Sequence, residues 1–181
     1  AKILTLSHSK LERMAIRRKC HPALVELTAK LQCDAYLAIP YNGRAIIADV
    51  TYKEGIFDGG ITIGAANSVN TSACGKICAA YVEPAQIDDF LAANPLRVTP
   101  KSIHDLRLFK EHLAKVRRDN VAVCDDEIDL GTYAVACPVL DKDGKLLAAL
   151  GVAASFPDDK LKALIIQQLK HITNLLSTQG E

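Results

Sequence analysis

Two segments of the chain are predicted to form β-hairpins, and they constrain the fold more than any other feature. Residues 35–51 hold two short runs rich in Ile, Val, Leu and Tyr on either side of Asn42-Gly43, a dipeptide preferred in tight hairpin turns. Residues 131–155 hold two further apolar runs around Asp141-Lys142-Asp143-Gly144. Strands joined as hairpins, without a helical crossover, pair antiparallel. The sequence therefore predicts an antiparallel sheet.

Helical patterns stand before and between these hairpins. After Pro22 three leucines recur at helical spacing and predict a helix that begins near His21: Leu24, Leu27 and Leu31. Between the hairpins, Thr71 or Ser72 can cap a second helix that runs to about Val82. The Gly-rich residues 55–64 between these features are expected to form a bent strand or a loop that folds over a pocket.

Two more helices are predicted in the second half. Ser102 with Asp105 three residues later approximates a capping box, and one apolar face follows it: Leu106, Phe109, Leu113 and Val116. A closing helix is expected over residues 158–176, with an acidic start that suits the helix dipole. Helices alternating with hairpins place the chain in the α+β class, an antiparallel sheet flanked by helices.

Charge and length limit the functions that remain. With 181 residues the chain fits one domain. Lys+Arg of 22 against Asp+Glu of 21 gives a net charge of +1, without the positive field that phosphate binding requires, so we expect no DNA contact by this segment. The basic run 17–19 beside His21 is interpreted as a solvated helix face. No stretch is apolar enough to suggest a membrane span, and a cytoplasmic location is expected.

The six cysteines favour packing over chemistry. No two of them form a CxxC pair, so zinc-ribbon and thioredoxin-like motifs are excluded by spacing. Most stand in apolar runs, where a free thiol behaves as a small hydrophobe. An alternative stays open in which three thiols converge as a metal or redox sensor: Cys74, Cys78 and Cys124. A position at a helix start would lower the pKa of Cys74 and make it more reactive than Cys78.

Several motifs together resemble the effector-binding domain of the IclR family of bacterial transcriptional regulators. They occur in that family's order and spacing over about residues 20–178: Ile63-Gly64, 72–76, 99–103, 125–131 and 134–141. The resemblance implies a fold similar to GAF and PAS sensors, in which a curved antiparallel sheet carries helices on its faces and a ligand cup beneath loops. It further implies that residues 1–19 are the end of a connector helix from an N-terminal winged helix-turn-helix head, and that residues 20–181 are the effector-binding domain.

The resemblance also implies a function and a set of ligand contacts. The domain is expected to bind a small organic or aromatic acid, to associate with itself as a dimer or tetramer, to modulate DNA binding by the N-terminal head, and to be neither an enzyme nor a cofactor-binding protein. By alignment of the motifs the ligand-binding positions are Ile56, Gly59, Ser72, Ala73, Cys74, Cys124, Ala134, Gly151 and Ala153.

This chain departs from the family at three of those positions. The family often has an acidic residue where this chain has Cys124, and hydroxyl-bearing residues where it has Gly151 and Ala153. We therefore expect a pocket of Ile, Ala, Gly and Cys, which favours a less polar or bulkier ligand. The free amides in the first turn of the helix at residues 73–75 would still be available to a carboxylate.

Three other interpretations apply to parts of this sequence. The acidic residues 125–129 lack the alternation of a calcium loop and are expected to form a solvated turn. A hydrolase that uses Cys74 or Cys124 with a histidine base is supported by no nucleophile motif. A dimerisation module with a vestigial pocket, which would bind nothing small, stays open because polar side chains are lost from the ligand positions.

Overall fold

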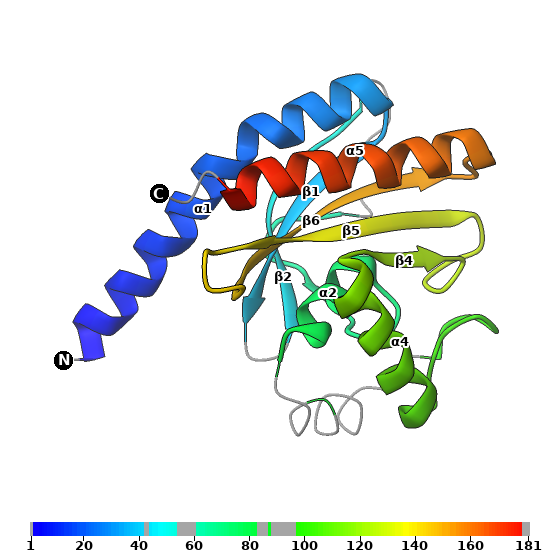
Figure 1. The fold of residues 1–181 in the computed structure, drawn as a ribbon, viewed down its shortest axis with the longest axis horizontal. Coiled ribbons are helices and arrows are strands. Elements are labelled where there is room, and N and C mark those ends of the chain that lie inside the picture. The colour runs from blue at the N-terminus through cyan, green and yellow to red at the C-terminus, as the bar shows by residue number, and fades with distance from the viewer. Residues whose placement is uncertain (1, 42–43, 54–60, 83–86, 88–96, 179–181) are drawn as a thin grey trace.

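A computed structural model describes residues 2–41, 44–53, 61–82, 87 and 97–178, with the backbone alone for residues 2–13. In this part of the chain, six strands and four helices form one α+β unit (Figure 1). They are α1 (Lys2–Leu31), β1 (Asp34–Tyr41), β2 (Arg44–Thr51), β3 (Ala66–Asn67), α2 (Ala73–Ala80), α4 (Leu106–Asp119), β4 (Ala122–Asp125), β5 (Thr132–Leu140), β6 (Leu146–Ser155) and α5 (Asp159–Thr178).

The sheet confirms both predicted hairpins. All its pairs are antiparallel, in the order β3-β2-β1-β6-β5-β4, so the two hairpins β1–β2 and β5–β6 meet side by side in the centre. Register shifts occur at Leu37/Ala38 and at Val139/Leu140, and irregularities of this kind increase the twist of a sheet. The predicted class, a curved antiparallel sheet flanked by helices, is confirmed. The Asn42-Gly43 turn lies outside the described residues.

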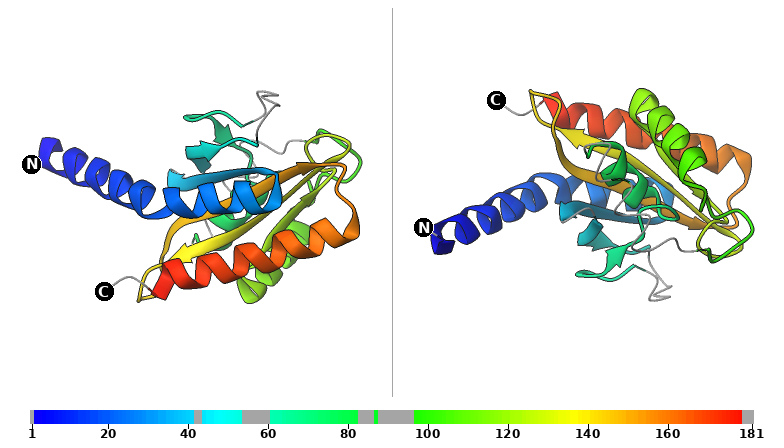
Figure 2. Two further views of the ribbon diagram at one scale, coloured as in Figure 1. Left: turned by 90° about the horizontal axis from the view of Figure 1, so that it is seen from above. Right: turned by 90° about the horizontal axis from the view of Figure 1, so that it is seen from below.

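The sheet separates two hydrophobic cores. α1 and α5 cover one face, and α2 and α4 cover the other (Figure 2). The α1–α5 face is packed with large side chains that include Leu24, Leu37 and Leu169. The α2 face of the sheet is built largely from small side chains: Ala38, Ala45, Ala134, Ala136, Ala149 and Gly151. Small residues let α2 lie close to the strands, and this face carries the candidate site.

The first helix differs from the prediction. A helix was expected to begin near His21, but α1 runs without a break from Lys2 to Leu31 and contains Pro22. Proline removes only one intrahelical donor, and the fully buried side chains of Cys20 and Leu24 on either side hold the helix against the sheet. The proposed boundary between residues 19 and 20 therefore falls inside one helix, and the division into connector and domain stays a prediction. None of the helices in the described ranges has the length and hydropathy to cross a bilayer.

The start of α4 was also predicted one turn too early. Asp105, and not Ser102, is the N-cap, and its carboxylate accepts a hydrogen bond of 2.8 Å from the Leu108 amide. Leu106 is consequently 40% exposed and does not belong to the buried face, which consists of Phe109, Leu113 and Val116. The closing helix is confirmed, with the Asp158 carboxylate accepting from the Leu161 amide at its start.

The basic run in α1 is not simply a solvated face. Asp49 on β2 is 2% exposed, and its carboxylate lies 3.2 Å from Arg17 Nε and 2.9 Å from His21 Nδ1. Burial opposes the ionisation of Asp49, but the hydrogen bonds from Arg17 and His21 outweigh it and lower the pKa of the carboxyl group. Lys19 donates to the carbonyl of Leu176 in α5. These contacts attach α1 to the sheet and to α5.

Replacing Asp49 by asparagine should weaken this attachment. Asp49→Asn removes the charge that Arg17 and His21 share, and we expect the free energy of unfolding to fall by about 1–2 kcal/mol, the lower range for charged hydrogen bonds because Arg17 is half exposed. Urea denaturation measures the loss. Asp143→Asn, in the exposed turn between β5 and β6, is the matched control. Equal stability of the two variants would show that the Asp49 contacts contribute nothing.

Candidate functional site

A cleft opens at one end of the sheet, where β1 begins, β6 ends and β5 begins. Its volume is about 470 Å³. The first turn of α2 and the loop between β4 and β5 close its sides. Apolar and small side chains form the inner wall, and polar side chains are distributed around them: Tyr36, Ile61, Ala73, Ile128, Ala134, Ala153 and Ala154, with Asp34, Lys53, Asn67, Ser72, Asp129, Thr132 and Ser155.

The structure places the sequence-predicted site residues in two groups. Ser72, Ala73, Ala134 and Ala153 line the cleft. The other described positions are buried on the same face of the sheet without lining the cleft: Cys74, Cys124 and Gly151. Ile56 and Gly59 lie outside the described residues.

The cleft is more polar than expected. A pocket of Ile, Ala, Gly and Cys was predicted, yet one ammonium group and two carboxylates line it, those of Lys53, Asp34 and Asp129. The Asp34 carboxylate accepts a hydrogen bond of 2.9 Å from the backbone amide of Lys53, and Asp129 is exposed at the rim. No described residue pairs with the Lys53 ammonium. The sequence analysis did not identify Lys53 as a site residue because it lies two residues after the end of the predicted strand. Its position was nevertheless a signal, since loops at strand ends commonly carry binding groups.

The amides at the start of α2 are only partly available to a ligand. Ser72 is the N-cap, and its hydroxyl accepts from the Gly75 amide at 3.0 Å while it donates to the Ser68 carbonyl at 2.6 Å. The Gly75 amide is thus already bonded, which corrects the expectation that it would serve a carboxylate. A Cβ atom at Gly75 would lie 1.9 Å from the Ser68 carbonyl oxygen, so this close approach requires glycine. The first-turn amides of Ala73 and Cys74 have no acceptor within the helix.

The thiols of this face are buried, and their pKa values are raised. Cys74 is fully buried, and burial raises the pKa of its thiol well above the ordinary value, so the predicted lowering at a helix start is wrong. Burial also raises the pKa of Cys78 to about 12 and raises that of Cys124. Within the described part of the chain no three Cys, His, Asp or Glu side chains form a group that could hold a metal ion. The three thiols therefore do not converge as a metal site.

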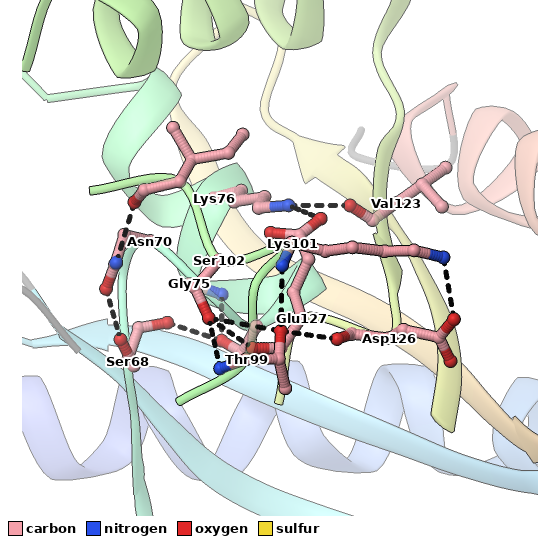
Figure 3. Close-up of polar contacts among 12 residues, drawn as sticks. Ser68, Asn70, Gly75, Lys76, Thr99, Lys101, Ser102, Val123, Asp126 and Glu127 are labelled. Carbon is pink, nitrogen blue, oxygen red and sulfur yellow. Dashed lines mark hydrogen bonds and ion pairs between the residues drawn. The ribbon is translucent and has the colours of Figure 1, made fainter. Parts of the chain in front are cut away.

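A buried ion pair joins α2 to the acidic loop, residues 126–131 between β4 and β5. Lys76 in α2 is 0% exposed, and its ammonium donates to Glu127 Oε1 at 2.5 Å and to the Val123 carbonyl at 2.8 Å (Figure 3). Glu127 is 8% exposed, so the expectation of a solvated turn is wrong at this residue, whereas residues 128–130 are exposed. Burial raises the pKa of the Glu127 carboxyl group, and Lys76 offsets part of that effect.

The segment at residues 99–103 holds the backbone of the acidic loop from the other side. Ser102 donates to the Glu127 carbonyl at 2.9 Å, and Thr99 donates to the Asp126 carbonyl at 2.7 Å (Figure 3). Lys101 pairs with the Asp126 carboxylate at 2.7 Å. These contacts fix the loop at two successive carbonyls. The next two residues, 128 and 129, line the cleft, so the network sets the position of that wall.

His112 on α4 stands near this network as a neutral group. Its Nε2 atom is buried and has no hydrogen-bond partner among the described residues, and the same holds for Glu127 Oε2. Burial, together with the charges of Lys76 and Lys115, lowers the pKa of His112 to about 4. The imidazole is therefore uncharged at neutral pH.

The fold is that of C-terminal domains of bacterial transcriptional regulators. A profile of the family described as bacterial transcriptional regulator IclR, C-terminal, matches residues 8–176. The chain therefore belongs to the IclR family, and the resemblance found in the sequence is confirmed.

Three known proteins illustrate the similarity. The Pca regulon regulatory protein of Pseudomonas putida is 25% identical over 154 residues, 84% of this chain and 53% of that protein, so the chain spans about half of that relative. An IclR homologue from Microbacterium hydrocarbonoxydans, solved with 4-hydroxybenzoate, has a TM-score of 0.83 at 16% identity, covering 92% of this chain and 68% of the other. The inducer-binding domain of a PobR double mutant from Acinetobacter, solved with 3-hydroxybenzoic acid, has a TM-score of 0.78 at 22% identity, covering 87% and 95%.

The contributions of Lys76 and Glu127 to stability should be coupled, because removing either partner leaves the other buried without its counter-charge. Glu127→Gln leaves a buried ammonium without its counter-charge, and we expect it to lower the free energy of unfolding by about 3 kcal/mol. Lys76→Met should have a similar effect, while the double variant should lose clearly less than the sum of the two. Urea denaturation completes this double-mutant cycle. Glu111→Gln, which breaks the exposed pair with Arg107, is the control and should change stability by less than about 0.5 kcal/mol. Additive losses would contradict the coupling.

His112 should make stability depend on pH in the acid range. Its folded pKa lies below its unfolded value, so its contribution is present above pH 6.5 and is lost as the pH falls toward about 4. His112→Gln should remove this part of the decline, and the imidazole C–H resonance should titrate near pH 4 by NMR. His104→Gln is the control, a histidine at the exposed start of the α4 segment. A titration of His112 near pH 6.5 would overturn the assignment.

Proposed function

We propose that this domain senses a small organic acid, foremost a hydroxylated aromatic acid, in the cleft at the end of the sheet, and thereby modulates DNA binding by an N-terminal winged helix-turn-helix head. The observation that carries the proposal is the composition of the cleft. The ammonium of Lys53, which pairs with no residue in the described ranges, stands at a cleft whose inner wall is made of alanines, isoleucines and Tyr36. A pocket of this kind, largely apolar with a few polar groups, is typical of small-molecule sites.

Each part of such a ligand has a counterpart in the cleft. The Lys53 ammonium and the first-turn amides of α2 would bind the carboxylate. The carboxylates of Asp34 and Asp129 would repel an acid that lacked hydrogen-bond donors, but they can accept hydrogen bonds from ligand hydroxyl groups. The ring would pack on Tyr36 and on the alanines of β5 and β6. This pattern favours a hydroxy acid over a plain acid, and the two related structures that contain hydroxybenzoates support the same class.

Regulation would follow from the two elements that border the cleft. A ligand that contacts both α2 and the acidic loop binds more tightly to one arrangement of them, and such a difference in affinity is what shifts a conformational equilibrium. In the proposed mechanism this shift changes how paired domains sit in a dimer or tetramer, and so changes the spacing of their DNA-binding heads in the cytoplasm. A catalytic role is not proposed, because the buried thiols of this face are neutral and no nucleophile–base pair is found among the described residues.

Ligand binding should stabilise the domain against heat. We expect 4-hydroxybenzoate or 3-hydroxybenzoate, at about 100-fold over its dissociation constant, to add about 2.7 kcal/mol and raise Tm by about 5–10 °C. Benzoate, which has no hydroxyl group, should give a smaller rise. A thermal-shift assay over a panel of hydroxy, keto, sugar and aromatic acids measures this directly.

Lys53→Met should abolish most of that rise. Loss of one charged hydrogen bond corresponds to about 1.5–3 kcal/mol, or roughly tenfold to a hundredfold in affinity. Lys142→Met, in the exposed turn between β5 and β6, is the matched control and should bind as the unmodified protein does. A flat response to the whole panel would remove the sensor proposal and favour a dimerisation module that binds nothing small.

A further inference from the structure

Tyr36 occupies the space behind the cleft. It lies on β1 directly opposite Gly151 on β6, and it is 3% exposed. A Cβ atom placed on Gly151 would lie 2.5 Å from Tyr36 Cζ and 2.9 Å from its hydroxyl oxygen. The phenol ring therefore covers Gly151, and the two residues are a matched pair: any side chain at position 151 would displace the ring.

The far end of this side chain reaches α2. Burial raises the pKa of Tyr36, and the nearby thiols of Cys74 on α2 and Cys124 on β4 raise it further. The ring thus extends from β1 over β6 to the first turn of α2. The Tyr36 side chain is therefore next to three of the predicted ligand-binding positions, Cys74, Cys124 and Gly151. The predicted positions that line the cleft lie on the other side of the ring.

We propose that Tyr36 is the specificity-determining residue that sets the depth of the cleft. Its ring fills an inner compartment bounded by Cys74, Cys124, Ala149 and Gly151, and the cleft ends at the ring. The ligand class follows from this depth, a step that rests on the proposed function. An acid whose carboxylate is attached directly to a single ring fits the cleft. An acid with an unsaturated chain between ring and carboxylate would need the space that Tyr36 holds.

The compartment should persist when the ring is removed. Its neighbours on the adjacent strands include Ala149 and Gly151, which carry at most a methyl group and cannot fill the space by changing rotamer. Leu37 and Leu150, the large side chains next to Tyr36 and Gly151 along their strands, belong to the opposite face of the sheet. The large side chains on the same face, such as Ile77 and Phe109, are held by α2 and α4. A smaller residue at position 36 would therefore connect the compartment to the cleft and expose the two thiols at its back.

Thiol modification tests the depth of the cleft without any ligand. The 181-residue chain and its Tyr36→Ala and Tyr36→Phe variants are treated with methyl methanethiosulfonate, a small thiol reagent, and the modified cysteines are mapped by mass spectrometry. We expect Cys74 or Cys124 to react in Tyr36→Ala, and neither to react in the unmodified protein or in Tyr36→Phe, which keeps the ring. Cys20 and Cys137, buried on the opposite face, must stay unmodified and so report on unfolding.

Equal protection of Cys74 and Cys124 in all three proteins would overturn the proposal. Reaction at Cys20 and Cys137 in Tyr36→Ala would mean that this variant unfolds. In that case the Tyr36→Leu variant is compared with the unmodified protein, because leucine fills the space beside β1 and leaves the space beside α2 empty. Reaction confined to Cys74 or Cys124 in that variant supports the proposal, and full protection contradicts it.

Ligand length gives the second measurement. We expect Tyr36→Ala or Tyr36→Leu to shift preference from 4-hydroxybenzoate toward 4-hydroxycinnamate by roughly tenfold, since each additional buried carbon contributes about fourfold in affinity. Equal binding of the longer acid by the unmodified protein would refute the depth limit. If the Tyr36 ring protects Cys74 but neither acid binds, Tyr36 is still the inner wall of the cleft, and the proposed sensing of hydroxylated aromatic acids is wrong. Failure of the proposed function is therefore distinguishable from failure of the depth limit.

Discussion

The buried ammonium of Lys76 is the constraint on which the site depends. All eight residues of α2 are buried, so the positive charge in its first turn is withdrawn from water and must be compensated inside the protein. The compensation comes from the Glu127 carboxylate and the Val123 carbonyl. Because Glu127 must point inward, the acidic loop folds back onto α2 and cannot extend into solvent. One charge thus fixes the relative placement of segments 72–76, 99–103 and 123–129, and the wall of the cleft follows from it.

The parts of the fold that local chemistry decides could be predicted from the sequence. Both hairpins carry turn sequences between alternating apolar runs, and their strands pair as expected. Ser72 caps α2 because its hydroxyl meets an amide three residues away. The errors occur where a distant partner decides. Ser102 has the sequence features of a cap, but its hydroxyl donates to the Glu127 carbonyl, and Asp105 caps the helix in its place.

The candidate site was predictable only in part, for the same physical reason. Some of the motif positions coincide with the cleft, since Ala73, Ala134 and Ala153 line it. Tyr36 is distant from these positions in the chain and meets them only because β1 pairs with β6. The pattern therefore could not indicate that its ring fills the space behind them. Cys74 illustrates the competing effects on one group: a helix start lowers a thiol pKa, but complete burial raises it and prevails.

The attachment of α1 at Asp49 has a mechanical consequence. The helix spans 30 residues, about 45 Å, and its N-terminal half extends past the sheet, away from the body of the domain (Figure 1). About 22 Å of helix lies beyond Arg17, so a tilt of about 10° at that point would carry the far end through about 4 Å. A tilt of α1 would therefore pivot about its contact with the buried carboxylate of Asp49. β2 carries that carboxylate and leads within four residues to Lys53 at the cleft, so a small rotation of a single strand would be geometrically amplified along α1.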